Sequence, residues 1–290
     1  MDGKVLALFS AMLFGINPIV LKVGLRDAAS EVAVFIGLLS GLPLLLLLGP
    51  FLGGFHLAEL RWDAGIYFAL GGLLGVVFGR TLLYMSIDRI GSSRAATFKN
   101  SAPLVTALVA FLLLQEIVDA QRAGGIFLVT LGLTLIGQMA RRQTGIITAS
   151  GLILAMMTAF FYGVRPVISK VGLEISPLPL AATLISYVTA VAVYAGYFLY
   201  RHQLRELFRV GSRKSYAAFA GGGLLQVAGL SLLNFALDLD DVTVIYPISA
   251  SAPLVTFLLS YLVLRNMERL TVWDLLGTTM VVSGVIMLLV

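Results

Sequence analysis

The sequence predicts an all-α membrane protein whose ten transmembrane helices form two inverted five-helix repeats. Hydrophobic residues make up 59% of the 290 residues and charged residues only 12%, and the mean hydropathy is +0.98. Apolar windows of membrane-spanning length recur along the chain, and residues of the first half return in the second half. A chain this apolar is not a water-soluble globule, so we expect a multi-pass protein of the cell membrane.

Each predicted span is a window of about 20 apolar residues, which is the length that crosses the hydrocarbon core. The first span begins almost at Met1 and lacks a small-residue cleavage site, so we expect a retained helix and not a signal peptide. The loop at 201–214 alternates arginines with apolar residues and is either an interfacial helix or a solvated basic loop. The ten spans are expected at residues 3–24, 31–50, 64–87, 92–114, 121–140, 148–170, 178–200, 215–237, 242–264 and 272–290.

One stretch of the fourth span recurs 150 residues later in the ninth. Residues 101–106 and 251–256 both read Ser-Ala-Pro-Leu-Val-Thr, whereas the residues just before them, including Lys99, differ. In hydrocarbon a proline frees a carbonyl and a buried ammonium is costly, and both are tolerated where helices surround a polar cavity. We therefore expect the binding site of a transporter near these two helices.

The two halves also match elsewhere, at offsets of 148 to 152 residues. Pro18 of the first span, for example, corresponds to Pro166 of the sixth. Because each unit has an odd number of helices, the second copy enters the membrane in the opposite orientation. This is the inverted-repeat plan of secondary transporters, which bind their solute at the repeat interface. We place the repeats at residues 1–144 and 145–290.

Lysine and arginine are distributed unequally between the two sides of the predicted membrane. One side collects thirteen of the twenty, the other side four, and the remaining three lie inside spans. The positive-inside rule then puts the thirteen in the cytoplasm and both termini outside.

The three basic residues inside the spans are Arg80, Lys99 and Arg165. Arg80 and Lys99 are expected at a matched depth of ~10–12 Å from one surface, and Arg165 nearer the opposite face. The sequence places no carboxylate at this depth, so the site would favour an anion, which arginine can bind through two parallel hydrogen bonds. In the alternative reading, Arg80 snorkels to helix-end carbonyls or pairs with Asp88, and Arg165 reaches the far interface.

Other polar and aromatic residues share helical faces with these cations or occupy the matching positions of the other repeat. Any one of them is more often an interhelical hydrogen bond than a ligand contact. Prolines in the first, fourth, sixth and ninth spans are expected to be hinges at which gating helices bend. The predicted substrate-binding residues are Arg80, Lys99, Arg165, Asn17, Tyr84, Tyr162, Tyr246, Ser249 and Asn234, and the predicted hinges are Pro18, Pro103, Pro166 and Pro253.

The sequence offers no pattern for a cofactor or a metal. It has no cysteine, its two histidines fall in predicted loops, and no P-loop is present. The basic residues in the turns are topology signals, so we expect no nucleic-acid partner. Glycines spaced seven apart, Gly125 with Gly132 and Gly277 with Gly284, indicate that the fifth and tenth helices pack closely. That packing is either within a monomer or across a homodimer.

The chain carries a set of short motifs in a fixed order. The first helix of each half contains Gly-Ile-Asn-Pro at 15–18 or Gly-Val-Arg-Pro at 163–166, and each fourth helix contains a proline. Glu116 or Glu268 then leads to a glycine-bearing fifth helix. With these motifs the whole chain resembles the EamA-type members of the drug/metabolite transporter superfamily.

The resemblance implies two inverted five-helix repeats, a central cavity between the first four helices of each half, and alternating-access transport of small organic solutes. Members of this family mostly look as if both termini are cytoplasmic, which is the reverse of what the charge distribution indicates here.

We therefore expect a secondary active transporter that moves an anionic or amphoteric metabolite, such as an amino acid, an organic acid or a phosphorylated metabolite, by rocking its two halves. The alternative is an exporter of neutral or aromatic compounds in which the basic residues are structural. A lipid-handling or intramembrane enzyme would need a catalytic constellation that the sequence does not offer. The expected partners are a small-molecule solute and membrane lipids, with the chain a monomer or a homodimer through helices 5 and 10.

Overall fold

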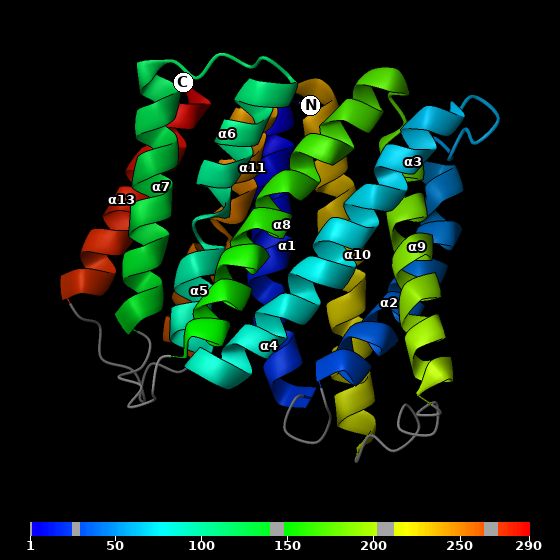
Figure 1. The fold of residues 1–290 in the computed structure, drawn as a ribbon, viewed down its shortest axis with the longest axis horizontal. Coiled ribbons are helices and arrows are strands. Elements are labelled where there is room, and N and C mark those ends of the chain that lie inside the picture. Colours follow the sequence, from blue (N-terminus) through cyan, green and yellow to red (C-terminus); the bar gives the residue numbers. More distant parts are fainter. Residues whose placement is uncertain (1, 25–29, 140–147, 202–211, 264–271) are drawn as a thin grey trace.

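The computed structural model describes residues 2–24, 30–139, 148–201, 212–263 and 272–290. The regular structure in these ranges is entirely helical, and both termini lie at the same end of the bundle, which we call the terminus end (Figure 1). Among the described residues, eight helical stretches are long and apolar enough to cross a membrane, and two shorter apolar helices bring the number to the predicted ten. The predicted repeat boundary at 144/145, most of the loop at 201–214, and Glu268 lie outside the described residues.

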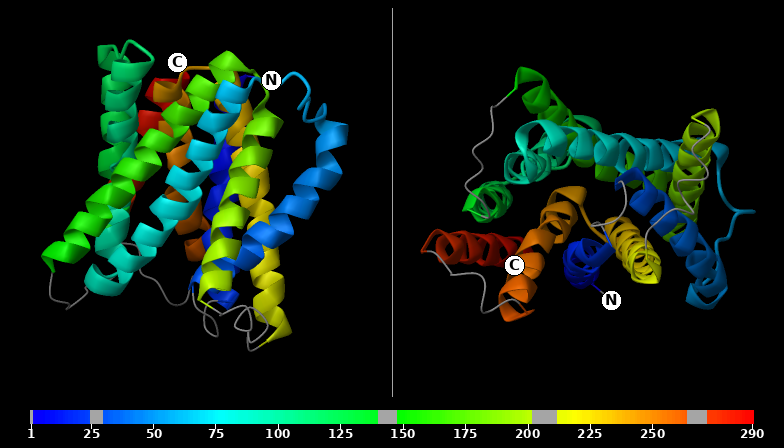
Figure 2. Two further views of the ribbon diagram at one scale, coloured as in Figure 1. Left: turned by 45° about the vertical axis from the view of Figure 1, so that its right-hand side comes forward. Right: turned by 90° about the horizontal axis from the view of Figure 1, so that it is seen from below.

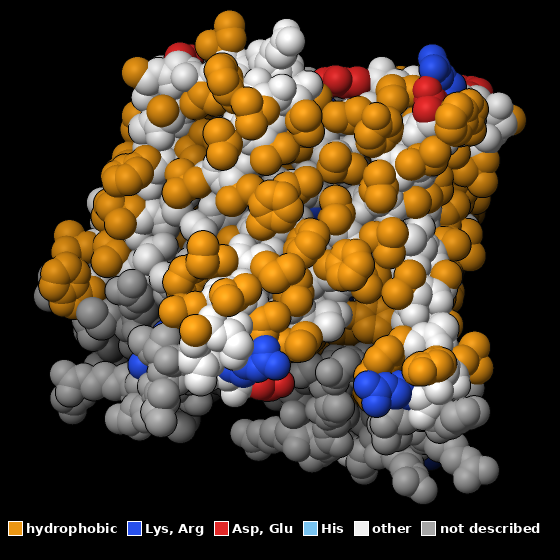
Figure 3. Space-filling model, viewed as in Figure 1, with side chains coloured by type: hydrophobic (Ala, Val, Ile, Leu, Met, Phe, Trp, Pro, Cys, Tyr) orange, Lys and Arg blue, Asp and Glu red, His pale blue; other side chains and the backbone are white. Residues whose placement is uncertain are grey.

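The helices follow the predicted spans to within a few residues. Hydrophobic side chains cover most of one face of the bundle, and charged side chains gather towards its two ends (Figure 3). The first repeat contains α1 (Gly3–Gly24), α2 (Ser30–Leu48), the short 3-10 helix η1 (Gly49–Leu52), α3 (Trp62–Gly71), the π-helix η2 (Gly72–Gly79), α4 (Arg80–Ile90), α5 (Ser92–Lys99), α6 (Ala102–Leu113) and α7 (Ala120–Met139). The second repeat contains α8 (Ala149–Ile175), α9 (Pro179–Tyr200), α10 (Arg213–Leu239), α11 (Val242–Ala250), α12 (Ala252–Val263) and α13 (Val272–Leu289).

The fourth and ninth spans are each broken into two helices at the same point of the repeat. The breaks separate α5 from α6 and α11 from α12, just before Pro103 and Pro253. Pro103 lies in the first turn of α6, where its missing N–H removes no helical hydrogen bond. The expected bend within a continuous helix is therefore a break between two half-helices, whereas Pro18 and Pro166 lie inside the unbroken helices α1 and α8.

The helices pack in two layers that each draw on both repeats (Figure 2, right). In one layer, α1 packs against α10, α11 and α12, and α2 packs against α10. In the other, α8 packs against α3, η2, α4, α5 and α6. We call these the α1–α10 layer and the α4–α8 layer. Each layer mixes helices of both repeats, so the layers do not coincide with the two sequence repeats.

The repeated Ser-Ala-Pro-Leu-Val-Thr stretch makes the same contact in each layer. The hydroxyl of Thr106 donates to the carbonyl oxygen of Gly163 at 2.8 Å, and the hydroxyl of Thr256 donates to that of Gly15 at 2.7 Å. A Cβ at Gly163 would lie 2.6 Å from the Cβ of Val105. The glycine and the threonine together bring α8 against α6, and α1 against α12, at backbone distance.

Helices α7 and α13 pack against each other along the glycines that the sequence singled out. A Cβ at Gly132 would lie 2.6 Å from the carbonyl oxygen of Gly277, and one at Gly284 would lie 2.7 Å from that of Gly125. The four glycines are therefore used within one chain. A homodimer through helices 5 and 10 would have to use other faces of these helices.

We predict that Gly163→Ala destabilises the protein by about 1–3 kcal/mol, because the added methyl group overlaps α6 and overpacks the contact. The measurement is the free energy of unfolding in mixed micelles at increasing denaturant. Gly196→Ala is the matched control, since no atom lies within 4 Å of a Cβ at this position of α9. Equal stability of the two variants would contradict the packing role of Gly163.

Candidate functional site

The third span contains a π-helix, η2, directly before Arg80. Segments with π-helical hydrogen bonding are rare and occur mostly at functional sites. Its glycines let neighbouring helices approach the backbone: a Cβ at Gly72 would lie 2.5 Å from the carbonyl oxygen of Ser186 in α9. Arg80 thus begins α4 at the end of a wide-turned segment that is held close to α9.

Arg80 is surrounded by tyrosines from three helices. Its guanidinium interacts electrostatically with Tyr162 of α8, Tyr84 of α4, and Tyr194 and Tyr187 of α9. The hydroxyls of Thr81 and Tyr194 are hydrogen-bonded at 3.3 Å. In the described ranges, Arg80 forms no ion pair with Asp88 or with any other carboxylate.

Arg165 and Lys99 belong to the same group of side chains. Arg165 interacts electrostatically with Tyr246, Tyr162 and Tyr187, and with Arg80 itself. The ammonium of Lys99 lies 5.5 Å from the centroid of the Tyr162 ring, which is a cation–π distance. Arg165 does not reach the far interface, because only 7% of it is exposed.

The structure therefore brings together six of the nine predicted binding residues, and it adds Tyr187 and Tyr194. We call this group the cationic cluster: Arg80, Lys99, Arg165, Tyr84, Tyr162, Tyr187, Tyr194 and Tyr246.

Two residues at the cluster, Tyr194 and Gly75, were not predicted as parts of the site. Tyr187 and Tyr194 are seven residues apart and so share one face of α9, which is the signal that could have paired them. Gly75 lies directly under Arg165: a Cβ there would come within 2.1 Å of the Cδ atom of that arginine. A contact between η2 and α8 leaves no local pattern in the sequence, so this glycine could not be recognised as part of the site.

The other three predicted residues have hydrogen-bond partners elsewhere in the chain. Asn17 donates to Gln226 at 2.8 Å, and Asn234 donates to Thr183 at 2.9 Å. The hydroxyl of Ser249 lies 3.1 Å from that of Ser10. The side-chain oxygens of Asn17 and Asn234 are buried without a partner, so a role in binding stays a prediction for these two residues.

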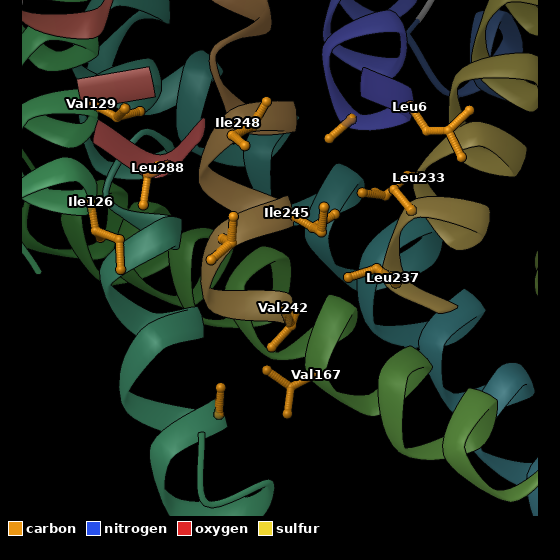
Figure 4. Close-up of a cluster of buried hydrophobic side chains, with 14 of the residues drawn as sticks. Leu6, Ile126, Val129, Val167, Leu233, Leu237, Val242, Ile245, Ile248 and Leu288 are labelled. Carbon is orange, nitrogen blue, oxygen red and sulfur yellow. The ribbon is translucent and has the colours of Figure 1, made fainter. Parts of the chain in front are cut away.

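At the terminus end an apolar cluster joins the two layers. It combines residues of the α1–α10 layer, such as Leu233 and Ile245, with Val167 of α8 (Figure 4). Val167 and Ile245 are fully buried. This cluster closes the space between the layers on the side of the termini.

Polar contacts reinforce the closure at the same end. The carboxylate of Glu116, which follows α6, accepts hydrogen bonds from the backbone N–H groups of Val242 and Thr243 at 2.8 and 2.9 Å, and from the Thr243 hydroxyl at 2.6 Å. The ammonium of Lys170 donates to the carbonyl oxygens of Leu237 and Asp240 at 2.8 and 3.1 Å. An anion thus caps the start of α11 and a cation caps the end of α10, where the helix dipoles favour these signs.

Outside this closure the terminus end carries a polar cavity of about 480 Å³. Glu116 and Lys170 are among its lining residues, and so are Arg122 and Asp241, which form an ion pair at 2.7 Å. The lining residues are Leu114, Gln115, Glu116, Ile117, Asp119, Arg122, Lys170, Glu174 and Asp241.

Comparison with known proteins relates the chain to transporters. A model of the EamA-like transporter family matches residues 1–138 and 149–290. An uncharacterized protein of Methanocaldococcus jannaschii is 26% identical over 141 residues, which cover 48% of this chain and 96% of that protein. That relative therefore has about the length of one repeat. A solved crystal structure superimposes with a TM-score of 0.79 over 98% of this chain and 95% of the other, at 16% sequence identity, and so shares the fold.

We predict that Glu116→Ala opens the terminus end, because it removes all three hydrogen bonds to the start of α11. The chain has no cysteine, so Val167→Cys can report access with a maleimide on protein in lipid nanodiscs. Labelling of this buried site should rise at least about tenfold, which corresponds to about 1.4 kcal/mol. Glu174→Ala is the control, since Glu174 is exposed and lines the same cavity. Equal labelling of the two variants would show that Glu116 does not hold the closure.

Proposed function

Because the chain belongs to the EamA-like transporter family, it is a multi-pass membrane transporter and not an enzyme, and we propose that it carries small anionic or amphoteric metabolites. The solute class includes amino acids, organic acids and phosphorylated metabolites. The transporter is secondary active and works by alternating access. Arg80, Lys99 and Arg165 serve as countercharges for the solute.

The uncompensated charge of the cationic cluster carries this proposal. All three cations interact with Tyr162, and the ion pairs of the described ranges all lie elsewhere, towards the helix ends. Cations inside a membrane protein are costly and persist where they pair or serve a solute pathway. An anionic solute would supply the missing negative charge.

The closed terminus end supports alternating access. The apolar cluster around Ile245 and the hydrogen bonds of Glu116 and Lys170 join the layers at that end. A solute that reaches the cationic cluster in this conformation would have to enter from the opposite end. Transport then requires a second conformation in which these contacts at the terminus end are broken.

The test of the function is uptake into proteoliposomes of a panel of amino acids, carboxylates and phosphate esters, with and without preloaded counter-solute. Uptake of anions that is accelerated by an internal anion would support exchange of the proposed solutes. Uptake restricted to neutral or aromatic compounds would favour the alternative, in which the three cations are structural.

We predict that Lys99→Gln raises the KM for the transported anion by about tenfold, which is about 1.4 kcal/mol of binding, because it removes one of three countercharges. The measurement is initial uptake at varied solute concentration, with folding checked by size-exclusion elution. Lys214→Gln is the control, since Lys214 is an exposed cation near the start of α10. An unchanged KM in a folded Lys99→Gln variant would show that Lys99 does not contribute to binding of the solute.

A further inference from the structure

The three cations of the cluster all belong to one layer. Arg80 begins α4, Lys99 ends α5 and Arg165 lies in α8, and these helices are part of the α4–α8 layer. The positive charge is therefore one-sided.

The matching positions of the other repeat lie in the α1–α10 layer and are all uncharged. Asn17 corresponds to Arg165, Ser249 to Lys99, and Leu230 to Arg80. Their exposed fractions are 8%, 3% and 2%, so each is buried. Asn17 and Ser249 are also hydrogen-bonded within their own layer, to Gln226 of α10 and Ser10 of α1. The two layers thus present different chemistry to a solute between them.

Arg165 presents one edge of its guanidinium without a partner. Its Nε and Nη2 atoms are both buried and form no hydrogen bond within the described residues. The N–H groups on these two atoms point the same way along one edge of the planar group. This is the geometry with which arginine takes two oxygens of one carboxylate or phosphoryl group. The hydroxyl of Tyr187, which neighbours Arg165, is buried and unpartnered as well.

The π-helix fixes the orientation of that edge. A Cβ at Gly75 would lie 2.1 Å from Cδ and 3.0 Å from Nε of Arg165, so the arginine stem lies directly on the glycine backbone. A side chain held in this way keeps its hydrogen-bonding edge in place before the solute arrives, which lowers the entropic cost of binding.

In the described ranges, the cluster offers no carboxylate that would pair with an ammonium group. Among the described residues, no aspartate or glutamate neighbours Arg80 or Arg165, and the groups that interact with them are tyrosines and each other. An ammonium on the solute would face three like charges with no carboxylate to offset them.

We propose that the cationic cluster binds the carboxylate or phosphoryl head of an anion whose remaining part is uncharged, and that it discriminates against zwitterions. The head lies on the Nε–Nη2 edge of Arg165, and the tail points to the uncharged α1–α10 layer. This inference rests on the proposed transport of small anions and narrows it, because it removes amino acids from the solute class.

The test compares pairs of compounds that differ by one ammonium group. The carboxylate pairs are propionate with alanine and 3-phenylpropionate with phenylalanine, and the phosphate pair is ethyl phosphate with phosphoethanolamine. The measurement is the dissociation constant of each compound for the full chain in nanodiscs, from the ligand-induced shift of the unfolding temperature. The anion should bind at least about tenfold more tightly than its zwitterionic partner. Comparison of the carboxylate pairs with the phosphate pair shows which of the two head groups the cationic cluster binds.

Two outcomes separate this inference from the proposed function. If both members of the pairs bind within threefold of each other, the anion site stands and the discrimination against zwitterions is wrong. If only the zwitterions bind, the inference is wrong and the proposed function stands. If no member of any pair binds, the anion site and the proposed function are both wrong.

Variants test the role of the Arg165 edge. Arg165→Lys keeps the charge but lacks the two parallel N–H groups, and it should weaken anion binding about tenfold. Gly75→Ala should do the same by displacing the arginine stem, whereas Gly65→Ala in α3, with its nearest atom 3.8 Å away, should not. Wild-type affinity in both Arg165→Lys and Gly75→Ala would overturn the assignment of the head group to Arg165.

Discussion

The arrangement of the helices depends on two glycines at which there is no room for a methyl group. Because Gly163 has no side chain, α6 packs closely against α8, and Gly15 allows the same packing of α12 against α1. In each case a threonine hydroxyl donates a hydrogen bond to the glycine carbonyl oxygen. The stretch Ser-Ala-Pro-Leu-Val-Thr is identical in the two repeats because it makes this same contact twice. The break between α5 and α6, and that between α11 and α12, includes the first residue of this stretch, so the contact lies just after the break in both repeats.

The residues that differ between the two repeats determine the charge of the candidate binding site. Both copies need the glycine and the threonine to pack, so these residues are the same, whereas the packing leaves the positions of Arg165 and Asn17 free to differ. The result is a pair of layers with a shared scaffold and unequal charge. A symmetric pair would place cations on both sides and repel itself across the interface, while the one-sided arrangement confines the repulsion to a single layer that tyrosines surround.

Much of the fold and part of the candidate site could be predicted from the sequence, because they follow from local sequence patterns. The ten spans follow from apolar windows, the repeat from residue identity, and the grouping of Arg80 with Lys99 from their depth. The exchange of helices between layers could not be predicted, since neither hydropathy nor offset says which helix packs against α1. The π-helix η2 could not be predicted either. Nor could the contact between Gly75 and Arg165, which are 90 positions apart in the sequence.

The division of contacts between layers decides what can move. The hydrogen bonds of Glu116 and Lys170 run from the α4–α8 layer to the α1–α10 layer, so separation of the layers at the terminus end must break them. The contact of Arg165 with Gly75 joins α8 to η2, and the bond of Thr106 to Gly163 joins α6 to α8, both inside one layer. These contacts survive any rigid motion of the layers. In the proposed alternating access, the cations would therefore keep their mutual geometry while the terminus end opens, and an anion bound to them would travel with the α4–α8 layer.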